Sequence, residues 1–320
     1  MDSDERNHLD RIALADAVIF TGGTNLVEHY SFAKQLDEII AAEAVGTPVF
    51  LYTQSMGPYR RPKKRALMVR LLPQCALIFL RDERSRAHLR ELGMPEATMS
   101  VHADAAFALA NGVVARPCGG ARRVAISVRA WSHSQRADGT DAWEEYRRAI
   151  GDAARALASD GVEVVFLSTC QGIPEYWTDD STFARRIVEE FLFDVPGVSV
   201  DAEFHSPEEM VRLYRGFDAV IATRMHAAIL ALIANTPVLG IAYEFKTREL
   251  MATVGLGAFC VDYEVVSGAL LSERSRALLA DAPALGAQVA ARIPRFRDDA
   301  RAPAMRIRDW LAAHTAGRAS

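Results

Sequence analysis

The sequence predicts an α/β protein of two Rossmann-like domains, each built on a parallel sheet. Short apolar runs alternate with amphipathic helical segments, which is the pattern of successive β–α–β units. This alternation is interrupted once, in the Gly-, Pro- and Arg-rich stretch 110–123, and then starts again. At 320 residues the chain is long enough to bury two separate cores. The predicted division is an N-terminal domain of residues 1–115 and a C-terminal domain of residues 116–320.

The first domain shows four clear strands with helical segments between them. About the first 15 residues predict helix or coil, where a domain of this type ordinarily opens with a strand. One interpretation is therefore that this domain lacks its first strand and helix. The predicted strands are Ala17–Thr21, Val49–Thr53, Ala76–Leu80 and Thr98–Val101, and the predicted helices are Ser31–Ala44, Lys63–Leu72 and Glu83–Leu92.

The second domain repeats the cycle. Ser206 and Glu209 form a capping box, and Pro207 occupies the first helical position between them, so a helix is expected to begin there. A last amphipathic helix is expected over Ala304–Ala313, packing back across the other domain. The predicted strands are Val124–Val128, Val162–Leu167, Val198–Val200, Ala219–Ala222 and Val238–Ala242.

The charge balance does not suggest a generic polyanion-binding surface, and no nucleic-acid partner is expected. The chain has 37 Lys+Arg against 41 Asp+Glu, a formal net charge of -4. One local basic run stands out at Arg60–Arg65. Its ordinary interpretation is a solvated helix start, and the alternative is contact with an anionic acceptor or a lipid phosphate, that is, a peripheral membrane contact.

Cysteine usage and hydropathy indicate a cytoplasmic protein. The four cysteines are scattered singly, which argues against a zinc site or a disulfide framework and fits a reducing compartment. The charged N-terminus lacks the apolar core of a signal peptide. No apolar run reaches the roughly 18 to 20 residues of a transmembrane segment. The cysteines are Cys75, Cys118, Cys170 and Cys260.

The main candidate site follows the strand Ala219–Ala222. The next residues lead into an apolar helix, and in an open α/β sheet such a junction lies at the carboxyl edge, where ligands bind. Arg224 supplies a planar cation there, and His226 supplies a group that can give or take a proton near neutral pH. The strand Val238–Ala242 then delivers a second group of side chains to the same edge, namely Tyr243, Glu244 and Lys246.

A second arginine is expected beside the first. Arg129 and Trp131 follow the strand Val124–Val128, so Arg129 and Arg224 can form an anion clamp for phosphate and carboxylate. The structural alternative for Arg224 is a salt bridge to Glu244, which we rank below the functional interpretation. For His226, a helix cap or a core histidine is as plausible from position alone as a catalytic role.

The first domain offers weaker candidates at its own strand ends. Gly22 and Gly23 follow a strand and would let the backbone approach a ligand, although a plain tight turn explains them equally well. Gln54 ends the next strand and is a candidate substrate contact. Further along, Arg81 and Asp82 are expected to form a structural ion pair at a helix start. For His102 and Asp104, a hydrogen bond at the core edge is as plausible as catalysis.

Taken together, the motifs GGTNL, TQSMGP, RDERS, VHADAAFAL, ISVRAW and ATRMHAAILALIANTPVLGIAYEFK make the sequence resemble the polysaccharide pyruvyl transferase family. The resemblance covers about Ala17 to Arg248. It implies a two-domain fold like that of the GT-B glycosyltransferases, with the site in the cleft between the domains. It also implies transfer of the enolpyruvyl unit of phosphoenolpyruvate to sugar hydroxyls, usually closing a pyruvate ketal on a cell-surface glycan or exopolysaccharide.

Carried over to this sequence, the resemblance makes Arg129 and Arg224 the arginines of the site, His226 the catalytic histidine and Lys246 the lysine after the last strand. No metal or cofactor is implied beyond phosphoenolpyruvate as donor substrate. The acceptor is a sugar or a lipid-linked glycan. Two features depart from the family: its opening Gly- and Asn-containing segment with a following Gly-Asp has no counterpart here, and its Asp-Pro is Asp104-Ala105.

Two other functions stay open at this point. A nucleotide-sugar glycosyltransferase or epimerase on the same fold would place Glu244 on a ribose and Arg224 or Lys246 on a diphosphate. A non-catalytic, degenerate member of the family would bind sugar or anion as an assembly partner.

Overall fold

The structure, a computed structural model, describes residues 3–23, 26–28, 33–111, 122–130, 141–171 and 179–315. Two compact units emerge from the contacts within the chain. Unit 1 comprises Met1–Ala108 and Phe296–Ser320, and unit 2 comprises Leu109–Arg295. Within the described ranges, no helix is long and apolar enough to cross a membrane.

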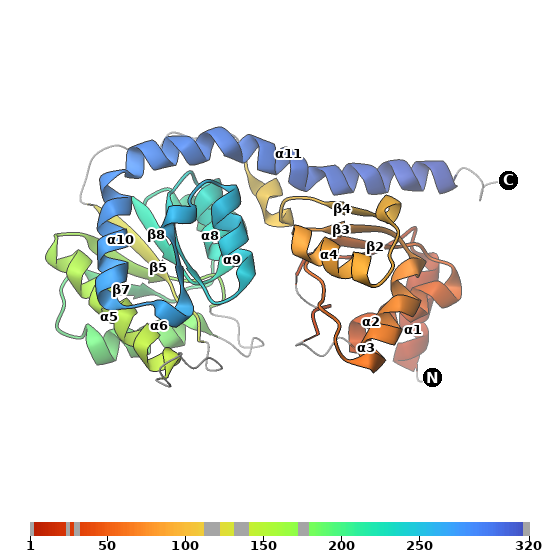
Figure 1. The fold of residues 1–320 in the computed structure, drawn as a ribbon, viewed down its shortest axis with the longest axis horizontal. Helices are drawn as coiled ribbons and strands as arrows, with labels where there is room; N and C mark the ends of the chain where they lie inside the picture. Colours follow the sequence, from red (N-terminus) through yellow and green to blue (C-terminus); the bar gives the residue numbers. More distant parts are fainter. Residues whose placement is uncertain are drawn as a thin grey trace. The chain divides into compact units, whose positions relative to one another are not determined.

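Unit 1 holds a parallel sheet in which strands that are consecutive in the sequence are neighbours. In the described part of this unit the sheet order is β1-β2-β3-β4 (Figure 1). The strands are β1 (Val18–Phe20), β2 (Val49–Gln54), β3 (Cys75–Leu80) and β4 (Met99–Val101). The helices are α1 (Ser3–Leu14), α2 (Ala33–Val45), α3 (Pro62–Leu71) and α4 (Glu83–Glu91), with short 3-10 helices at Leu72–Gln74, Glu96–Thr98 and Ala105–Leu109.

The last helix closes one face of this sheet. α11 runs from Ala282 to Thr315, and its residues from Phe296 on belong to unit 1. Trp310 meets the ring of Phe50 edge-on, with the centroids 5.3 Å apart, and Ile307 is buried against the same face. The predicted return of the C-terminal helix to the other domain is therefore confirmed.

α11 is also much longer than the predicted Ala304–Ala313. It runs through Pro294 and Pro303, residues that disfavour a helix interior because they lack a backbone donor. From local sequence preference, the helix was therefore predicted to begin only after the second proline. The packing of its apolar face against unit 1 lets the helix continue.

Unit 2 holds a parallel sheet of a different order. Among its described residues the order is β10-β9-β8-β5-β6-β7, the arrangement of a doubly wound Rossmann-like sheet. Strand order reverses between β5 and β8. The strands are β5 (Arg123–Ser127), β6 (Glu163–Leu167), β7 (Val198–Asp201), β8 (Ala219–Ala222), β9 (Val238–Ala242) and β10 (Cys260–Asp262). The helices are α5 (Ala142–Ser159), α6 (Asp180–Phe191), α7 (Pro207–Tyr214), α8 (Met225–Ile233), α9 (Phe245–Thr253), α10 (Gly268–Ala280) and the first part of α11, with 3-10 helices at Gly257–Phe259 and Tyr263–Val265.

The stretch from β8 to β9 forms the centre of unit 2. α8 is apolar on every side, and its residues Ala227–Ile233 are all buried, as expected for a helix inside a core. The helix ends at Asn235, whose φ of 61° is a left-handed conformation that asparagine tolerates. The Thr236 hydroxyl then donates to the Tyr214 carbonyl oxygen at 2.8 Å. These contacts fix the turn between α8 and β9, at the end of the helix opposite the β8–α8 junction from which the candidate site projects.

The predicted elements agree with the structure to within one to three residues, apart from α11. β8 and β9 have the predicted bounds, and the capping box of Ser206 and Glu209 is present at the start of α7. The short strand β10 was not predicted. Most of the predicted linker lies outside the described residues. Residues from 296 on, which the predicted division placed in the second domain, are part of unit 1.

Candidate functional site

The two predicted arginines leave adjacent strands at the point where strand order reverses. Ser127 at the end of β5 is paired with Ala222 at the end of β8, and the Thr223 N–H donates to the Ser127 carbonyl oxygen at 2.9 Å. Arg129 and Arg224 each follow by two residues. In doubly wound sheets the crevice at such a switch point is where ligands bind. Both side chains therefore lie at the expected edge.

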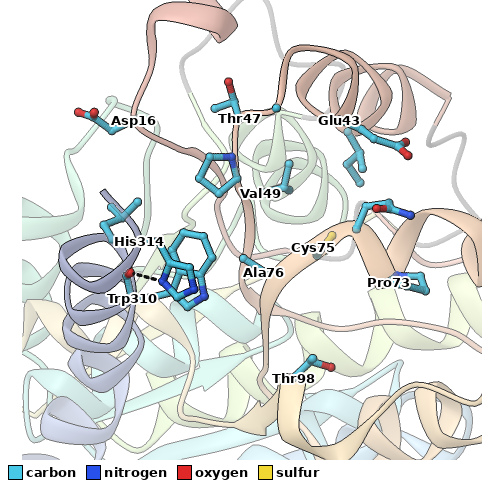
Figure 2. A pocket seen from close by; sticks show the side chains of 15 residues that line it. Asp16, Glu43, Thr47, Val49, Pro73, Cys75, Ala76, Thr98, Trp310 and His314 are labelled. Carbon is cyan, nitrogen blue, oxygen red and sulfur yellow. Dashed lines mark hydrogen bonds between the residues drawn. The ribbon is translucent and has the colours of Figure 1, made fainter. Parts of the chain in front are cut away.

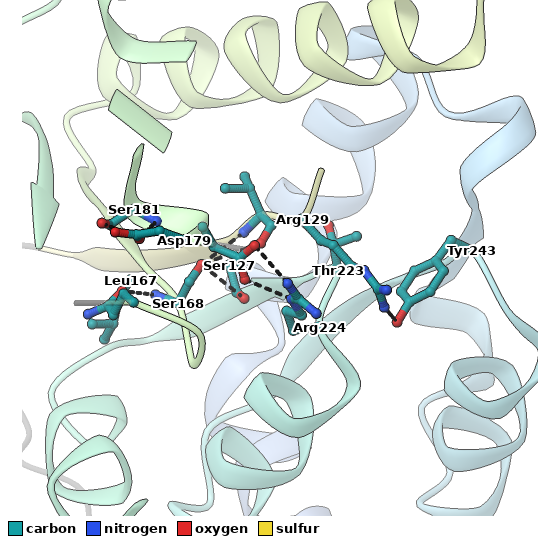
Figure 3. A network of polar contacts seen from close by, with 12 residues as sticks. Ser127, Arg129, Leu167, Ser168, Asp179, Ser181, Thr223, Arg224 and Tyr243 are labelled. Carbon is teal, nitrogen blue, oxygen red and sulfur yellow. Dashed lines mark hydrogen bonds and ion pairs between the residues drawn. The ribbon is translucent and has the colours of Figure 1, made fainter. Parts of the chain in front are cut away.

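Arg224 is held by an aspartate that sequence analysis did not identify. Its Nε and Nη2 donate to the two carboxylate oxygens of Asp180, at 2.7 and 2.8 Å (Figure 3). The side chain of Asp180 is 1% exposed and that of Arg224 is 14% exposed. The structural alternative for Arg224, a salt bridge to Glu244, was therefore wrong, because the partner of Arg224 is Asp180. The arrangement fixes the plane of the guanidinium and leaves its Nη1 outside this pair.

Arg129 is positioned by two tyrosines. Its guanidinium lies over the ring of Tyr243, 4.4 Å from the centroid, and donates to the Tyr243 hydroxyl (Figure 3). The backbone N–H of Arg129 donates to the Tyr146 hydroxyl at 3.3 Å. The side chain remains partly exposed, so it can still reach a ligand at the edge of the sheet.

A buried polar layer supports these loops. The Tyr146 hydroxyl bonds with the Thr223 hydroxyl at 2.7 Å. The Val128 N–H donates to the Ser168 hydroxyl at 3.2 Å, and the Ser168 N–H donates to the Gln171 side-chain oxygen at 3.0 Å. Buried polar groups that are paired in this way hold their loops in one arrangement. The strand ends of β5, β6 and β8 are thereby joined below the two arginines.

The electrostatics of the site follow from this geometry. Burial raises the pKa of the Asp180 carboxyl, whereas the hydrogen bonds from Arg224 and the charges of Arg224 and Arg129 act in the opposite direction. Burial is the largest single influence on Arg224 and disfavours its charge, but the hydrogen bonds to Asp180 and the negative charge of Asp180 together outweigh burial and raise the pKa of the guanidinium. The charges of Arg224 and Arg129 thus both act on one buried carboxylate, that of Asp180. The remaining positive charge is suited to an anionic ligand.

The other predicted residues of this edge are placed as follows. His226 is an exposed residue in the first turn of α8. Lys246 and Glu244 form an ion pair of 2.6 Å at the start of α9, with side chains 14% and 23% exposed. Trp131 lies outside the described residues. Arg129, Arg224 and His226 therefore come from the two strand ends beside the switch point, and Glu244 and Lys246 come from the next strand end, after β9.

The candidates at the strand ends of unit 1 have internal partners. Gly23 bridges to Gln54, and a Cβ on Gly22 would lie 2.9 Å from the Thr53 hydroxyl, so the two strand ends approach each other closely. The Gln54 side chain is 1% exposed and donates to the carbonyl oxygens of Phe20 and Thr21, at 3.3 and 2.5 Å. These contacts give the glycine pair and Gln54 a structural role at this edge.

The charged residues of the same edge are also paired inside unit 1. Arg81 forms an ion pair of 2.7 Å with Asp104 rather than with Asp82, and both side chains are nearly buried, at 6% and 11%. Asp82 instead caps α4 by accepting from the Ser85 N–H at 2.6 Å. His102 bonds with Asp299 at 2.9 Å. These contacts support the structural interpretation of the four residues. Arg81, however, pairs with Asp104 and not with the predicted partner Asp82.

A cavity of about 640 Å³ lies at the opposite edge of this sheet (Figure 2). It is lined by Val49 and Cys75, the first residues of β2 and β3, and by Trp310 and His314 of α11. This is the amino edge, whereas ligands of parallel α/β sheets bind at the carboxyl edge. Burial raises the pKa of the Cys75 thiol to about 12, so it stays protonated.

No metal centre is formed by the part of the chain that the structure describes. No group of three or more His, Cys, Asp or Glu side chains there is arranged to hold an ion. The described cysteines, Cys75, Cys170 and Cys260, are free thiols, and Cys118 lies outside the described residues.

Sequence reasoning missed Asp180 and Tyr146, which hold the two arginines in place. The run Asp179–Thr182 shows a helix start, and Asp179 does cap α6 by accepting from the Ser181 N–H. Nothing in this local pattern separates a capping aspartate from one that turns inward. Asp180 lies 44 residues from Arg224, so only the sheet order brings the two together.

Comparison with known proteins adds a family and a relative. The family model described as polysaccharide pyruvyl transferase matches residues 2–244. This range includes Arg129, Arg224, His226 and Glu244 and ends before Lys246. The amylovoran biosynthesis protein AmsJ of Erwinia amylovora is 25% identical over 275 residues, which span 82% of this chain and 66% of that protein.

Solved structures with a similar fold include UDP-N-acetylglucosamine 2-epimerases. The enzyme of Neisseria meningitidis has a TM-score of 0.62 at 15% identity, over 96% of this chain and 80% of that one. The putative enzyme of Listeria monocytogenes has a TM-score of 0.58 at 12% identity, over 90% and 71%. Anabaena HepE, determined with UDP and glucose, has a TM-score of 0.55 at 12% identity, over 96% and 80%. At these identities the likeness concerns the fold alone, which is that of GT-B-like proteins.

Proposed function

Because the chain belongs to the polysaccharide pyruvyl transferase family, we propose that it transfers the enolpyruvyl unit of phosphoenolpyruvate to a sugar hydroxyl. The product would be a pyruvate ketal on a cell-surface glycan or an exopolysaccharide. The observation that carries the proposal is the placement of two guanidinium groups at the switch point of unit 2, with an exposed histidine at the start of α8.

The two arginines suit a small ligand with a phosphate and a carboxylate. Asp180 fixes Arg224 through Nε and Nη2, so Nη1 of Arg224 lies outside this ion pair. Tyr243 fixes the side chain of Arg129, which is partly exposed. Arginine binds both oxyanions in a planar geometry that lysine cannot reproduce. The N-terminus of α8 adds backbone donors and a favourable dipole at the same edge. We assign the carboxylate and phosphate of the donor to these groups.

The reaction needs a proton at the methylene carbon of phosphoenolpyruvate. His226 gives that proton as general acid, and positive charge develops at the neighbouring carbon, C2. A sugar hydroxyl attacks C2 and loses its proton. The phosphate departs with help from the arginines, and a second hydroxyl closes the ketal with loss of its own proton. One phosphoenolpyruvate and two hydroxyls thus give one ketal and inorganic phosphate, without a further reactant.

The alternative function is that of a nucleotide-sugar enzyme, because solved structures with a similar fold were determined with UDP and glucose or with UDP-GlcNAc. That function would place Glu244 on a ribose. In this structure Glu244 is already paired with Lys246 at 2.6 Å, so it would have to serve both partners. We therefore prefer the smaller donor.

The test is ligand-induced stabilisation of the purified chain, followed by a transfer assay. Phosphoenolpyruvate at about 100 times its dissociation constant should add roughly 2.7 kcal/mol of stability. This corresponds to a shift of a few degrees, at about 2 to 4 °C per kcal/mol. We expect the shift to persist with chelator and to be small or absent with uridine or guanosine diphosphate sugars.

The outcomes separate the three functions. A shift with a nucleotide sugar and none with phosphoenolpyruvate would assign the site to a glycosyltransferase or epimerase. Binding of phosphoenolpyruvate without phosphate release in the presence of any sugar acceptor would indicate a non-catalytic member of the family.

A further inference from the structure

α3 and the loop before it carry a concentration of positive charge that the proposed function does not use. Six cationic side chains fall within residues 60–70 of a chain whose net charge is -4. Five of them are exposed and one is half-buried. The helix lies beside α2 on the outside of unit 1 (Figure 1). The six are Arg60, Arg61, Lys63, Lys64, Arg65 and Arg70.

Among the described residues, most of this charge is not engaged in an ion pair with a carboxylate. The Glu28 carboxylate accepts from the backbone N–H groups of Arg60 and Arg61, at 3.1 and 2.7 Å, and thereby anchors the loop. The charges of Arg61 and Lys64 also act on Glu28 and help to lower its pKa. Arg65 donates to a backbone carbonyl oxygen, that of Glu91, at 2.6 Å. Within the described ranges, no ion pair engages the five exposed cations of this group. On the next helix, by contrast, Arg86 and Arg90 both pair with Glu96.

The exposed face of α3 is also apolar along its centre. Pro62, Ala66 and Val69 follow one another at helical spacing and are all exposed, Val69 to 44%. The opposite face is fixed, because Met68 and Leu71 are buried in the core of unit 1. Lys63 and Arg70 lie on one side of the apolar stripe and Arg65 on the other. The outward face is thus an apolar strip bordered by cations.

We propose that this face of α3, with the preceding loop, binds an anionic membrane surface. Lysine and arginine side chains reach the lipid phosphates while their methylene groups and Val69 rest against the interface. Each such cation contributes about 1 kcal/mol near an anionic leaflet. A soluble polyanion would use the charges but leave the apolar strip without a role. The proposal does not depend on the identity of the donor or the reaction.

The experiment is co-sedimentation of the full chain with vesicles. Neutral vesicles of phosphatidylcholine are compared with vesicles that also contain phosphatidylglycerol. We expect binding only to the latter, and we expect it to weaken as salt is raised. In the variant Lys63→Gln/Arg70→Gln, the partition coefficient should fall about thirtyfold, as two charges of about 1 kcal/mol each predict.

A matched control is Arg185→Gln/Arg186→Gln on α6. These two arginines are also exposed and lie in unit 2, so the net charge changes equally. Its vesicle binding should stay within twofold of the original chain. Equal loss in both variants, or binding that does not require phosphatidylglycerol, would overturn the proposal. Arg60→Gln/Arg61→Gln provides a second charge variant if the first one melts at a lower temperature.

Val69→Asp tests the apolar strip. The side chain is exposed, so we expect an unchanged melting temperature and a loss of vesicle binding of at least tenfold. A variant that binds vesicles as well as the original chain, or an original chain that binds heparin as tightly as it binds anionic vesicles, would contradict a membrane contact.

Discussion

The carboxyl edges of the two sheets carry the same kinds of side chain but use them differently. In unit 1, Arg81 pairs with Asp104 and donates to the Ser55 hydroxyl, while Asp82 caps α4. In unit 2, Arg224 pairs with Asp180 at similar burial. Beside this second pair, however, lie a partly exposed Arg129 and an exposed His226.

We infer from this difference what would make a buried ion pair part of a site. A buried arginine that is paired is, by itself, a structural feature. A second cation and an imidazole beside it, at a strand switch point, would add hydrogen-bonding capacity for a ligand. The following predictions test whether the two edges differ in this way.

The largest effect is expected for His226→Gln. Loss of the general acid should lower turnover of phosphoenolpyruvate by roughly two to four decades, and it should leave binding and melting temperature unchanged, because the residue is exposed. His314→Gln, at an exposed position of unit 1, is the control. Near-normal turnover in the His226 variant would remove this residue from the mechanism.

Removing the buried aspartate of each edge should destabilise both units. Asp180→Ala leaves Arg224 buried without its partner, and we expect a loss of about 3 to 5 kcal/mol in the free energy of unfolding. Asp104→Ala should cost less, because Arg81 keeps its bond to Ser55. Only the Asp180 variant should also lose the melting shift with phosphoenolpyruvate. A loss of this shift in both variants would show that the edges do not differ in function.

Arg224→Lys should have an intermediate effect on stability. With the guanidinium bonded twice to Asp180, we expect the loss of one charged hydrogen bond, about 1.5 to 3 kcal/mol, in addition to weaker binding. Denaturant unfolding and a phosphoenolpyruvate titration measure the two separately. Unchanged stability would mean that the pair with Asp180 is dispensable.

Arg129→Lys should be the mildest change in stability. Its contact with the Tyr243 ring is partly exposed, so the expected loss is about 0.5 to 1 kcal/mol. Affinity for phosphoenolpyruvate should fall about tenfold, as expected from one lost charged hydrogen bond of about 1.5 kcal/mol. An unchanged affinity would assign the donor to Arg224 alone.

The sequence by itself determined the local features of this protein. Apolar runs of three to six residues between helical segments defined nine of the strands that the structure describes, including β8 and β9 at their observed bounds. The turn chemistry around Asn235 and the cap of Ser206 depend on neighbouring residues only, so they could be predicted. The same holds for the position of Arg129, Arg224 and His226 after strands, since parallel strands place their carboxyl ends on one edge.

Only the tertiary structure decided the partners of these residues. Asp180, Tyr146 and Tyr243 meet the two arginines because β5, β6, β8 and β9 are neighbours in the sheet, an order that no local pattern contains. Likewise, Gln54 faces inward because β1 and β2 approach closely at Gly22, although its type and position fitted a ligand contact equally well. Burial of Ile307 and partial burial of Trp310 favour the packing of α11 on unit 1, against the local effect of two prolines on the helix. The position of a residue after a strand determines the edge of the sheet at which it lies. The contacts between distant segments determine which groups its side chain binds.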